Sequence, residues 1–411
     1  MTIFEILTYF SIFIGLYFAI FIFSTFFENR KKIHLKDDKQ YDFPLVSLVV
    51  PCYNEELNIA KTIQSILNLD YPSNKLDIIV IDDGSNDQTY QKAKEFELED
   101  NRVRVFKKEN GGKYTALNLG ISKAKADFVA TVDADSYLHT LSLRKMMLYF
   151  ADSSIKATIS TVVVDRPKNI LEGVQYVEYL MGGFLRKVFS FVGGINVVPG
   201  PLAVFRKEVF EKLGAFRRAY QTEDLEIALR MQRANYKIAH AIDAIVYTNG
   251  CKTFKELFYQ RLRWRQGLIF NFIDYKDLLN LKKHGNLAFL MINSIVGIFL
   301  SVAIFLFVAY QTISLIIRQI HFLFLIRWDT LTFSLPKLSW ITLNTTPVAL
   351  LSLVAIICCL IYILLSKIYT LNQEMKYTNI AFYILLFPIL NAVWWISTFW
   401  STLIRKEVIW K

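Results

Sequence analysis

Four long stretches without a charged side chain constrain this chain more than any other feature of its sequence. They are Ile6–Phe27, Leu287–Ile317, Leu338–Ser366 and Tyr377–Ile404. Each is at least as long as the ~20 residues with which an α-helix crosses ~30 Å of hydrocarbon. We therefore predict four membrane-spanning helices. The segment Gln319–Trp328 has too few apolar residues to cross, so we expect it to lie at the interface or to re-enter the membrane.

The charges that flank these stretches predict their orientation. A cleaved signal peptide would carry its cations before the apolar run, but Arg30–Lys32 follow the first run, which favours a retained helix. With Lys282–Lys283 before the second run, they predict that the region between faces the cytoplasm. Four spans would then put the C-terminus outside, whereas the cations within 405–411 favour the inside; both placements stay open. We expect a multi-pass protein of the cell membrane.

The charge balance and the cysteines narrow the partners. The net charge is +11, from 47 Lys and Arg residues against 36 Asp and Glu residues. Nucleic acid would suit this excess, but in so apolar a chain anionic lipid headgroups and a phosphorylated substrate explain it more simply. We expect membrane lipids and no nucleic acid as partners. The four cysteines show no C-x-x-C spacing, so reduced thiols are expected.

The region from Phe43 to Lys252 has the pattern of a soluble α/β domain. Short β-branched runs, 46–50, 77–82, 103–106 and 128–133, alternate with helical patterns. The stretches predicted to be helices are Glu55–Leu69, Gln88–Phe96 and Lys113–Ala124. This alternation predicts βαβ units in a doubly wound, mostly parallel sheet. Ligands bind such sheets beyond the carboxyl ends of the strands. The candidate site residues are therefore sought where each run ends.

Polar, acidic and glycine-bearing segments follow all four runs: "PCYNEE" (51–56), "DDGS" (82–85), "ENGGK" (109–113) and "DADS" (133–136). In "DADS", Asp133 and Asp135 can hold Mg²⁺ or Mn²⁺ beside a diphosphate, although Asp also makes ordinary turns. Asp83 can cap a helix or bind a ribose or base edge. The "ENGGK" glycines let backbone amides approach phosphate while Lys113 supplies charge, or they form a plain loop. No G-x-G-x-x-G follows the first run, which argues against a dinucleotide cofactor.

Two later segments combine charge with helical pattern. In "TED" (222–224), Thr222 reads as an N-cap with two acids in the first turn, yet a helix start also holds a catalytic carboxylate rigidly. In "YQRLRWRQG" (259–267), cations surround a tryptophan, and the amphipathic stretch 253–273 can also rest on lipid headgroups. The stretch 169–192 is predicted to be helical and too charged to span; it packs under the soluble domain or forms a core helix.

Taken together, "DDGS", "DADS", "TED" and "QRLRW" resemble the ordered signature of family 2 glycosyltransferases with a GT-A fold. The layout, one apolar helix before the domain and several after it, is similar to the processive, membrane-integrated synthases of chitin-like oligomers, poly-β-1,6-N-acetylglucosamine, hyaluronan and cellulose. The resemblance covers about Val46 to Gly267. It implies a domain order of 1–28 (transmembrane helix), 43–252 (cytoplasmic GT-A domain), 253–285 (interfacial helices) and 286–405 (about three transmembrane helices).

The resemblance also implies roles for individual residues. Asp224 would be the general base of an inverting transfer, and Asp135, with Asp133, would hold Mg²⁺ or Mn²⁺ at the diphosphate of a UDP-sugar. The residues that would bind the donor or the acceptor are Glu55, Asp83, Lys113, Asp133, Gln260, Arg263 and Trp264. "VPGP" (198–201) resembles a loop that lines the acceptor site in this group and is otherwise an ordinary turn.

The product is expected to be a polysaccharide, most closely one of N-acetylglucosamine. Nothing in the chain matches the regulatory elements of bacterial cellulose synthase, which disfavours cellulose. A glycolipid synthase that adds one or two sugars to ceramide, diacylglycerol or polyprenyl phosphate is the alternative, and a non-enzymatic scaffold is a second one. Coupled export and a small accessory membrane subunit are left open. Polar residues such as Asn293, Asn344 and Asn391 can line a sugar path or hydrogen-bond between helices.

Overall fold

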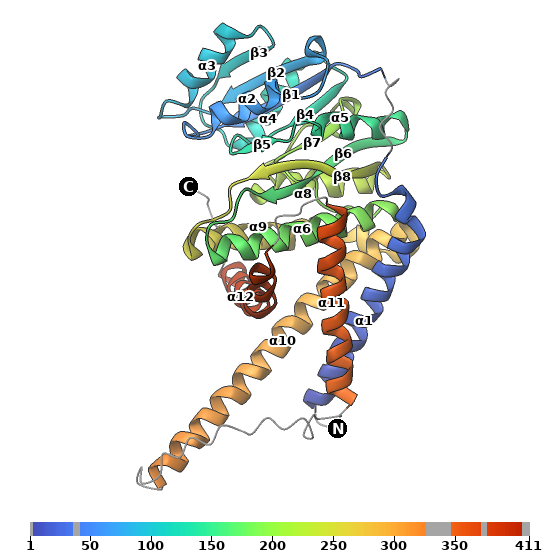
Figure 1. Ribbon diagram of the computed structural model, residues 1–411, viewed down its shortest axis with the longest axis vertical. Helices are drawn as coiled ribbons and strands as arrows, with labels where there is room; N and C mark the ends of the chain where they lie inside the picture. The colour runs from blue at the N-terminus through green and yellow to red at the C-terminus, as the bar shows by residue number, and fades with distance from the viewer. Residues whose placement is uncertain (1–2, 36–41, 326–346, 371–375, 405–411) are drawn as a thin grey trace.

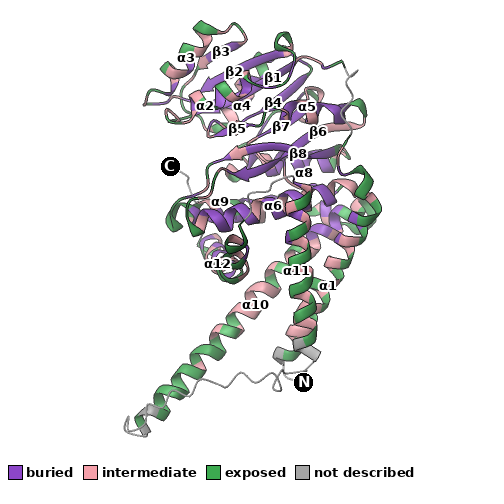
Figure 2. Cartoon of the chain, in the orientation of Figure 1, coloured by how far each residue is buried: buried purple, intermediate pink, exposed green. Residues whose placement is uncertain are grey.

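The computed structural model describes residues 3–35, 42–325, 347–370 and 376–404. An α/β domain carries the sheet, and helices α1, α10, α11 and α12 extend from the side of the domain where α6 and α9 lie (Figure 1). Burial differs sharply between the two parts: the strands are almost wholly buried, while α1, α10 and α11 expose much of their surface (Figure 2).

One eight-stranded sheet organises the α/β domain. Its strands are β1 (Val46–Cys52), β2 (Leu76–Asp82), β3 (Val103–Lys107), β4 (Phe128–Thr131), β5 (Ser136–Leu138), β6 (Ile155–Val164), β7 (Ala203–Arg206) and β8 (Lys237–Thr248). They lie in the order β3-β2-β1-β4-β7-β6-β8-β5. The four predicted runs are the parallel half, β1 to β4, while β7 joins β4 and β6 in antiparallel pairs and β6 pairs with β8 in parallel.

The strand order places a crevice at β1. From β1 the chain first builds outward through β2 to β3, then returns to add β4 on the other side of β1. The loops after β1 and β4 therefore leave the sheet in opposite directions, which is the switch point at which open α/β sheets bind ligands. Glu55 follows β1, and Asp133 and Asp135 follow β4.

Helices cover both faces of the parallel half, which confirms the predicted doubly wound arrangement. The helices are α2 (Ile59–Leu67), α3 (Thr89–Glu99), α4 (Lys113–Lys123), α5 (Ser142–Met147), α7 (Glu208–Leu213) and α8 (Glu223–Arg233). Apolar side chains of α2, α3 and α5 pack with Leu48 and Val50 on one face. Those of α4, α7 and α8 pack with Val49 on the other. Because β1 is buried on both faces, it reads as a continuous apolar run.

Two long helices, α6 (Ile170–Phe191) and α9 (Phe254–Asp274), lie beneath the sheet. Each begins with a capping box, Asn169 with Glu172 and Thr253 with Glu256, so their start points are fixed by local hydrogen bonds. Side chains of α6 pack with β6 and β8 on one side and with α11 and α12 on the other. Of the two interpretations of 169–192, packing under the domain is therefore confirmed.

Within the described residues, four helices are long and apolar enough to cross a membrane by length and composition. They are α1 (Ile3–Asn29), α10 (Leu281–Leu325), α11 (Pro347–Tyr369) and α12 (Tyr377–Leu403). Only 6–17% of each apolar span is buried within the protein, so their side chains need another apolar environment. Residues 319–325 of the segment Gln319–Trp328 continue α10, and the rest of that segment lies outside the described residues. Its position at the interface or as a re-entrant piece stays a prediction.

A methyl group at Gly120 tests how tightly α4 is seated on the sheet. It would lie 2.2 Å from Cγ1 of Val49, so we expect Gly120→Ala to destabilise the domain by about 1–3 kcal/mol through overpacking. Thermal unfolding of the purified protein measures this. Gly297→Ala is the matched control, since nothing lies within 4 Å of its methyl position. Val49→Ala removes the clashing methyls, so strictly additive effects of Gly120→Ala and Val49→Ala would contradict the packing.

Candidate active site

A cleft of about 670 Å³ opens at the crevice beside β1 and contains most of the predicted site residues. Those that line it are Glu55, Asp83, Lys113, Asp133, Asp135 and Arg263. Gln260, Trp264 and Asp224 are not among its described lining residues, although Glu223, the neighbour of Asp224, is. Segments from β1, β2, α4, β4, α8 and α9 thus meet in one place.

Asp83 organises the glycine loop at one end of the cleft. Its buried carboxylate accepts hydrogen bonds from the amides of Gly111 (3.1 Å) and Gly112 (2.9 Å) and from Nζ of Lys108 (2.6 Å). Gly112 has φ +90°, a conformation that favours glycine. These two amides are already engaged, so the interpretation that they approach phosphate finds no support here. Asp83 instead fixes the loop that leads into α4.

Lys113 joins two acidic segments that are far apart in the sequence. Its ammonium lies 2.5 Å from Oδ1 of Asp133 and 3.5 Å from Oε1 of Glu223. Burial alone would lower the pKa of Lys113, but the two carboxylates outweigh it and raise the pKa above its usual range. Lys113 therefore stays charged and holds the start of α8 against the end of β4.

Two further acids, Asp135 and Glu55, line the same cleft, and neither forms an ion pair with a described residue. Burial, and then the charge of Asp133, raise the pKa of Asp135; burial also raises the pKa of Glu55, with Asp135 and Asp133 adding to it against a hydrogen bond from Asn58. An all-oxygen set with excess negative charge suits Mg²⁺ or Mn²⁺. Among the described residues no three His, Cys, Asp or Glu side chains form a complete cage. A divalent ion here would need substrate oxygens as well, as Mg²⁺ commonly does.

Gly200, in the "VPGP" segment, packs against the ion pair of Lys113 and Asp133. A methyl group there would lie 2.8 Å from Oδ2 of Asp133 and 2.9 Å from Nζ of Lys113. The sequence pattern suggested only an ordinary turn or a loop near the acceptor. The close approach of Gly200 to Asp133 is a contact that only the folded chain reveals.

Asp224 stands in the first turn of α8 and is partly buried. Burial, followed by the charge of Glu223, raises the pKa of Asp224 to about 6, against the opposing effects of Lys113 and Arg263. A carboxyl group with this pKa is ionised at neutral pH and still accepts a proton readily. Thr222 sits at the N-cap position but makes no capping bond, so the N-cap prediction is wrong for its side chain. Its hydroxyl donates to the carbonyl oxygen of Ala219 (2.8 Å) instead.

The three residues of the Q-x-x-R-W element lie on α9 in different surroundings. Arg263 reaches the cleft and donates from an Nη to the carbonyl oxygen of Gln221 (2.6 Å). Trp264 is 38% exposed and receives the guanidinium of Arg261 over its ring at 4.3 Å. Oε1 of Gln260 is buried and has no hydrogen-bond partner among the described residues. The ring of Trp264 is thus partly exposed, and Oε1 of Gln260 makes no hydrogen bond with a described residue.

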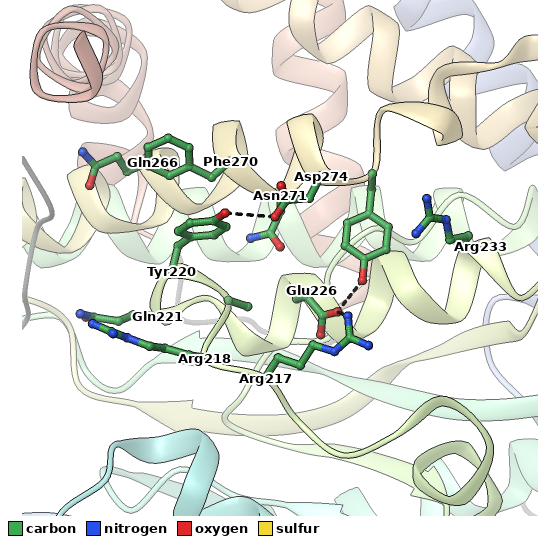
Figure 3. A pocket seen from close by; sticks show the side chains of 12 residues that line it. Arg217, Arg218, Tyr220, Gln221, Glu226, Arg233, Gln266, Phe270, Asn271 and Asp274 are labelled. Atoms are coloured by element: carbon green, nitrogen blue, oxygen red, sulfur yellow. Dashed lines mark hydrogen bonds and ion pairs between the residues drawn. The ribbon is translucent and has the colours of Figure 1, made fainter. Parts of the chain in front are cut away.

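Sequence reasoning missed several residues that line the cleft or adjoin it. Arg218 and Gln221 line it and also line a second cavity of about 620 Å³, which lies between the segment 217–221 and the C-terminal half of α9 (Figure 3). The sequence pattern predicts Glu223 only as an acid of the first helical turn, whereas the structure places it in the cleft. The motif spacing carried no signal for 217–221, because its role depends on contacts with α9, some 45 residues later in the chain.

Comparisons with known proteins agree with this geometry. The family model "Glycosyl transferase family 2" matches residues 47–214. The chain is 28% identical over 272 residues to the poly-beta-1,6-N-acetyl-D-glucosamine synthases of Staphylococcus epidermidis and Staphylococcus aureus (strain COL). These matches cover 65% of this chain and 66% of each relative, just under two thirds of the relatives' length.

A solved structure is similar over nearly the whole chain. It is the mannosyltransferase PcManGT from Pyrobaculum calidifontis, in complex with GDP-Man and Mn²⁺. The similarity covers 97% of this chain and 100% of that one, with a TM-score of 0.61 and 19% sequence identity. At this identity the likeness concerns the fold, including the α/β domain and the helices that extend from it.

Substitution of Gly200 tests the arrangement of the acids. We expect Gly200→Ala to displace Asp133 and to weaken Mn²⁺ binding by about tenfold, the lower end of the effect of disturbing a ligand's support. Titration of the purified protein with Mn²⁺ in the presence of saturating UDP, followed by electron paramagnetic resonance, gives the affinity. Gly15→Ala, whose methyl meets nothing within 4 Å, is the control. Equal affinity in the two variants would show that Asp133 takes no part in a cation site.

Proposed function

We propose that this chain catalyses the inverting transfer of a sugar, N-acetylglucosamine, from UDP-N-acetylglucosamine to a growing polysaccharide. Its residues 47–214 match the model of family 2 glycosyltransferases, and its α/β domain has the GT-A fold. The proposal of donor and product follows the names of the curated relatives. One observation carries the chemistry: the acids after β4, the ammonium of Lys113 and Glu223, the neighbour of Asp224 in the first turn of α8, converge at one cleft.

The donor is proposed to lie along the carboxyl ends of β1, β2 and β4. Asp83 and Glu55 line the part of the cleft at β1 and β2, where the nucleotide would bind, and Asp133 and Asp135 line the part at β4, where the diphosphate would reach. The residues present fit a divalent ion held by Asp135 and Asp133, as discussed above. When bound, Mg²⁺ or Mn²⁺ would neutralise charge on the departing diphosphate. Lys113 adds a second cation on the same side.

The transfer is proposed to be a single displacement. The acceptor hydroxyl oxygen forms a bond to the anomeric carbon while the bond from that carbon to the diphosphate oxygen breaks, and UDP leaves with the electron pair. Asp224 takes the proton of the hydroxyl, so an α-linked donor gives a β-linked product. Arg263 adds positive charge near the departing group. The exposed ring of Trp264 offers a face for an acceptor sugar, and Oε1 of Gln260 can accept from its hydroxyl groups.

The domain layout supports a membrane protein with its active site at one surface. We propose that α1, α10, α11 and α12 span the cell membrane, that α9 lies at the interface, and that the α/β domain faces the cytoplasm, where UDP-sugars are made. Exposed apolar side chains on these helices and the flanking cations Arg30–Lys32 and Lys282–Lys283 support this arrangement. A lipid acceptor remains the second candidate, because the four helices would bring a lipid close to α9. Coupled export and an accessory subunit stay predictions.

The acid limb of the pH profile tests the role of Asp224. A base must be ionised to accept a proton, so with a pKa of about 6 the turnover rate should rise roughly tenfold from about pH 5 to about pH 7 and then level. Initial rates at saturating donor measure this. Asp224→Asn should be inactive throughout. A wild-type rate that is flat over this range, or an active Asp224→Asn variant, would contradict the assignment.

Product analysis tests the proposed function itself. The purified protein in detergent is given radiolabelled UDP-N-acetylglucosamine, UDP-glucose and UDP-glucuronate in turn with Mg²⁺ or Mn²⁺, beside Asp224→Asn. We expect laddered, water-soluble chains from UDP-N-acetylglucosamine, absent in the variant. A single product that partitions into organic solvent would move the assignment to glycolipid synthesis. Absence of transfer from every donor would reject the proposed reaction.

A further inference from the structure

The segment just before the candidate base adopts an uncommon backbone conformation. Ala219, Tyr220 and Gln221 have φ values of +42°, +56° and +59°, so three consecutive residues with a Cβ are in the left-handed region. Such residues normally enter this region singly, because the Cβ then crowds the carbonyl oxygen. A run of three persists only where its surroundings hold it. The left-handed turn 219–221 ends three residues before Asp224.

One face of α9 supplies that hold. Arg263, Gly267 and Asn271 recur every four residues and so lie on the same side of the helix. Arg263 donates to the carbonyl oxygen of Gln221 (2.6 Å). The buried Nδ2 of Asn271 donates to Oγ1 of Thr222 (3.0 Å), whose own hydroxyl donates to Ala219 (2.8 Å). The contacts with α9 thus fall on Gln221, the last residue of the turn, and on Thr222, which follows it.

Gly267 sets how closely α9 approaches. A methyl group there would lie 2.4 Å from both Cγ2 and Oγ1 of Thr222 and 2.9 Å from its Cβ. Glycine is unfavourable in the interior of a helix because of its conformational freedom. At this position its lack of a side chain is what lets Thr222 and the backbone of α9 come into contact.

Further along the same face, α9 also holds the middle of the turn. The ring of Tyr220 lies 4.8 Å from that of Phe270, and its hydroxyl donates to Oδ2 of Asp274 (3.1 Å). Figure 3 shows these side chains on facing walls of the second cavity. On its far side the turn leads, through Thr222 and Glu223, into the first turn of α8.

We propose that Gly267 and Asn271 are positioning residues that seat the left-handed turn 219–221 on α9 and thereby fix where Asp224 stands relative to the donor. This inference rests on the proposed function for the role of Asp224, but the seating itself does not. Thr222 is the link: it contacts Gly267 and Asn271 and lies two residues before Asp224. The charged groups that act on Asp224 come from four helices: Glu223 from α8, Lys113 from α4, Arg263 from α9 and Arg186 from α6.

The test is a methyl group at Gly267, assayed in the full-length protein. We expect Gly267→Ala to lower the rate of transfer from UDP-N-acetylglucosamine at saturation by about 100-fold, the effect of a displacement near 1 Å. Affinity for UDP should stay unchanged, and amide hydrogen exchange within 219–225 should become faster. Gly297→Ala, a helical glycine with open space, is the matched control and should change none of these.

A double-substitution cycle separates seating from general damage. Thr222→Ala removes the two atoms that a Gly267 methyl would meet first, so Gly267→Ala should lower the rate by a smaller factor in that background than in the wild type. Exchange in Gly267→Ala equal to that in Gly297→Ala would overturn the inference. So would faster exchange with an unchanged rate, an equal penalty in both backgrounds, or a parallel loss of UDP binding. If the wild type transfers no sugar, the proposed function fails, and exchange alone decides the seating.

Discussion

The position of one ammonium group underlies the rest of the cleft. Lys113 lies between Asp133, at the end of β4, and Glu223, at the start of α8, with its ammonium 2.5 Å from the first carboxylate and 3.5 Å from the second. Carboxylates that share a buried site repel one another, and without a cation some of them would take up protons. Lys113 places a positive charge between Asp133 and Glu223, so the acids of β4 and α8 can occupy one cleft. Burial, followed by the negative charge of neighbouring acids, raises the pKa values of Asp135 and Glu55 in the same cleft.

This balance explains why the cleft draws on so many elements. The parallel half of the sheet supplies the acids at its carboxyl edge, α4 supplies Lys113, and α9 supplies Arg263. Because α9 lies between the sheet and the helices that are apolar enough to span a membrane, Arg263 belongs to the helical layer that joins these two parts of the protein.

Local pattern predicted those parts of the fold that depend on neighbours in sequence. The runs that became β1 to β4, the helices α4, α6 and α9, and the four apolar helices follow from periodicity and charge, and six of the nine predicted site residues line one cleft. Long-range contacts decided the rest. The amide of Glu55 donates to the hydroxyl of Thr89, so the loop after β1 is tied to the start of α3 by a contact that no local pattern predicts. The hydroxyl of Thr222 donates to the carbonyl oxygen of Ala219 and accepts from Nδ2 of Asn271, so it does not cap α8. The local pattern "TED" does not predict these contacts.

The central claim is that this cleft binds the diphosphate of a nucleotide-sugar at Asp133 and Asp135. An experimental structure of the full-length protein with UDP and Mn²⁺ tests it most directly. The account predicts the nucleotide beside Asp83 and Glu55, with Mn²⁺ bound to Asp135 and to oxygens of the diphosphate, and Lys113 beside the same diphosphate. UDP bound elsewhere, or bound in this cleft with neither Asp133 nor Asp135 near its phosphates, would contradict it.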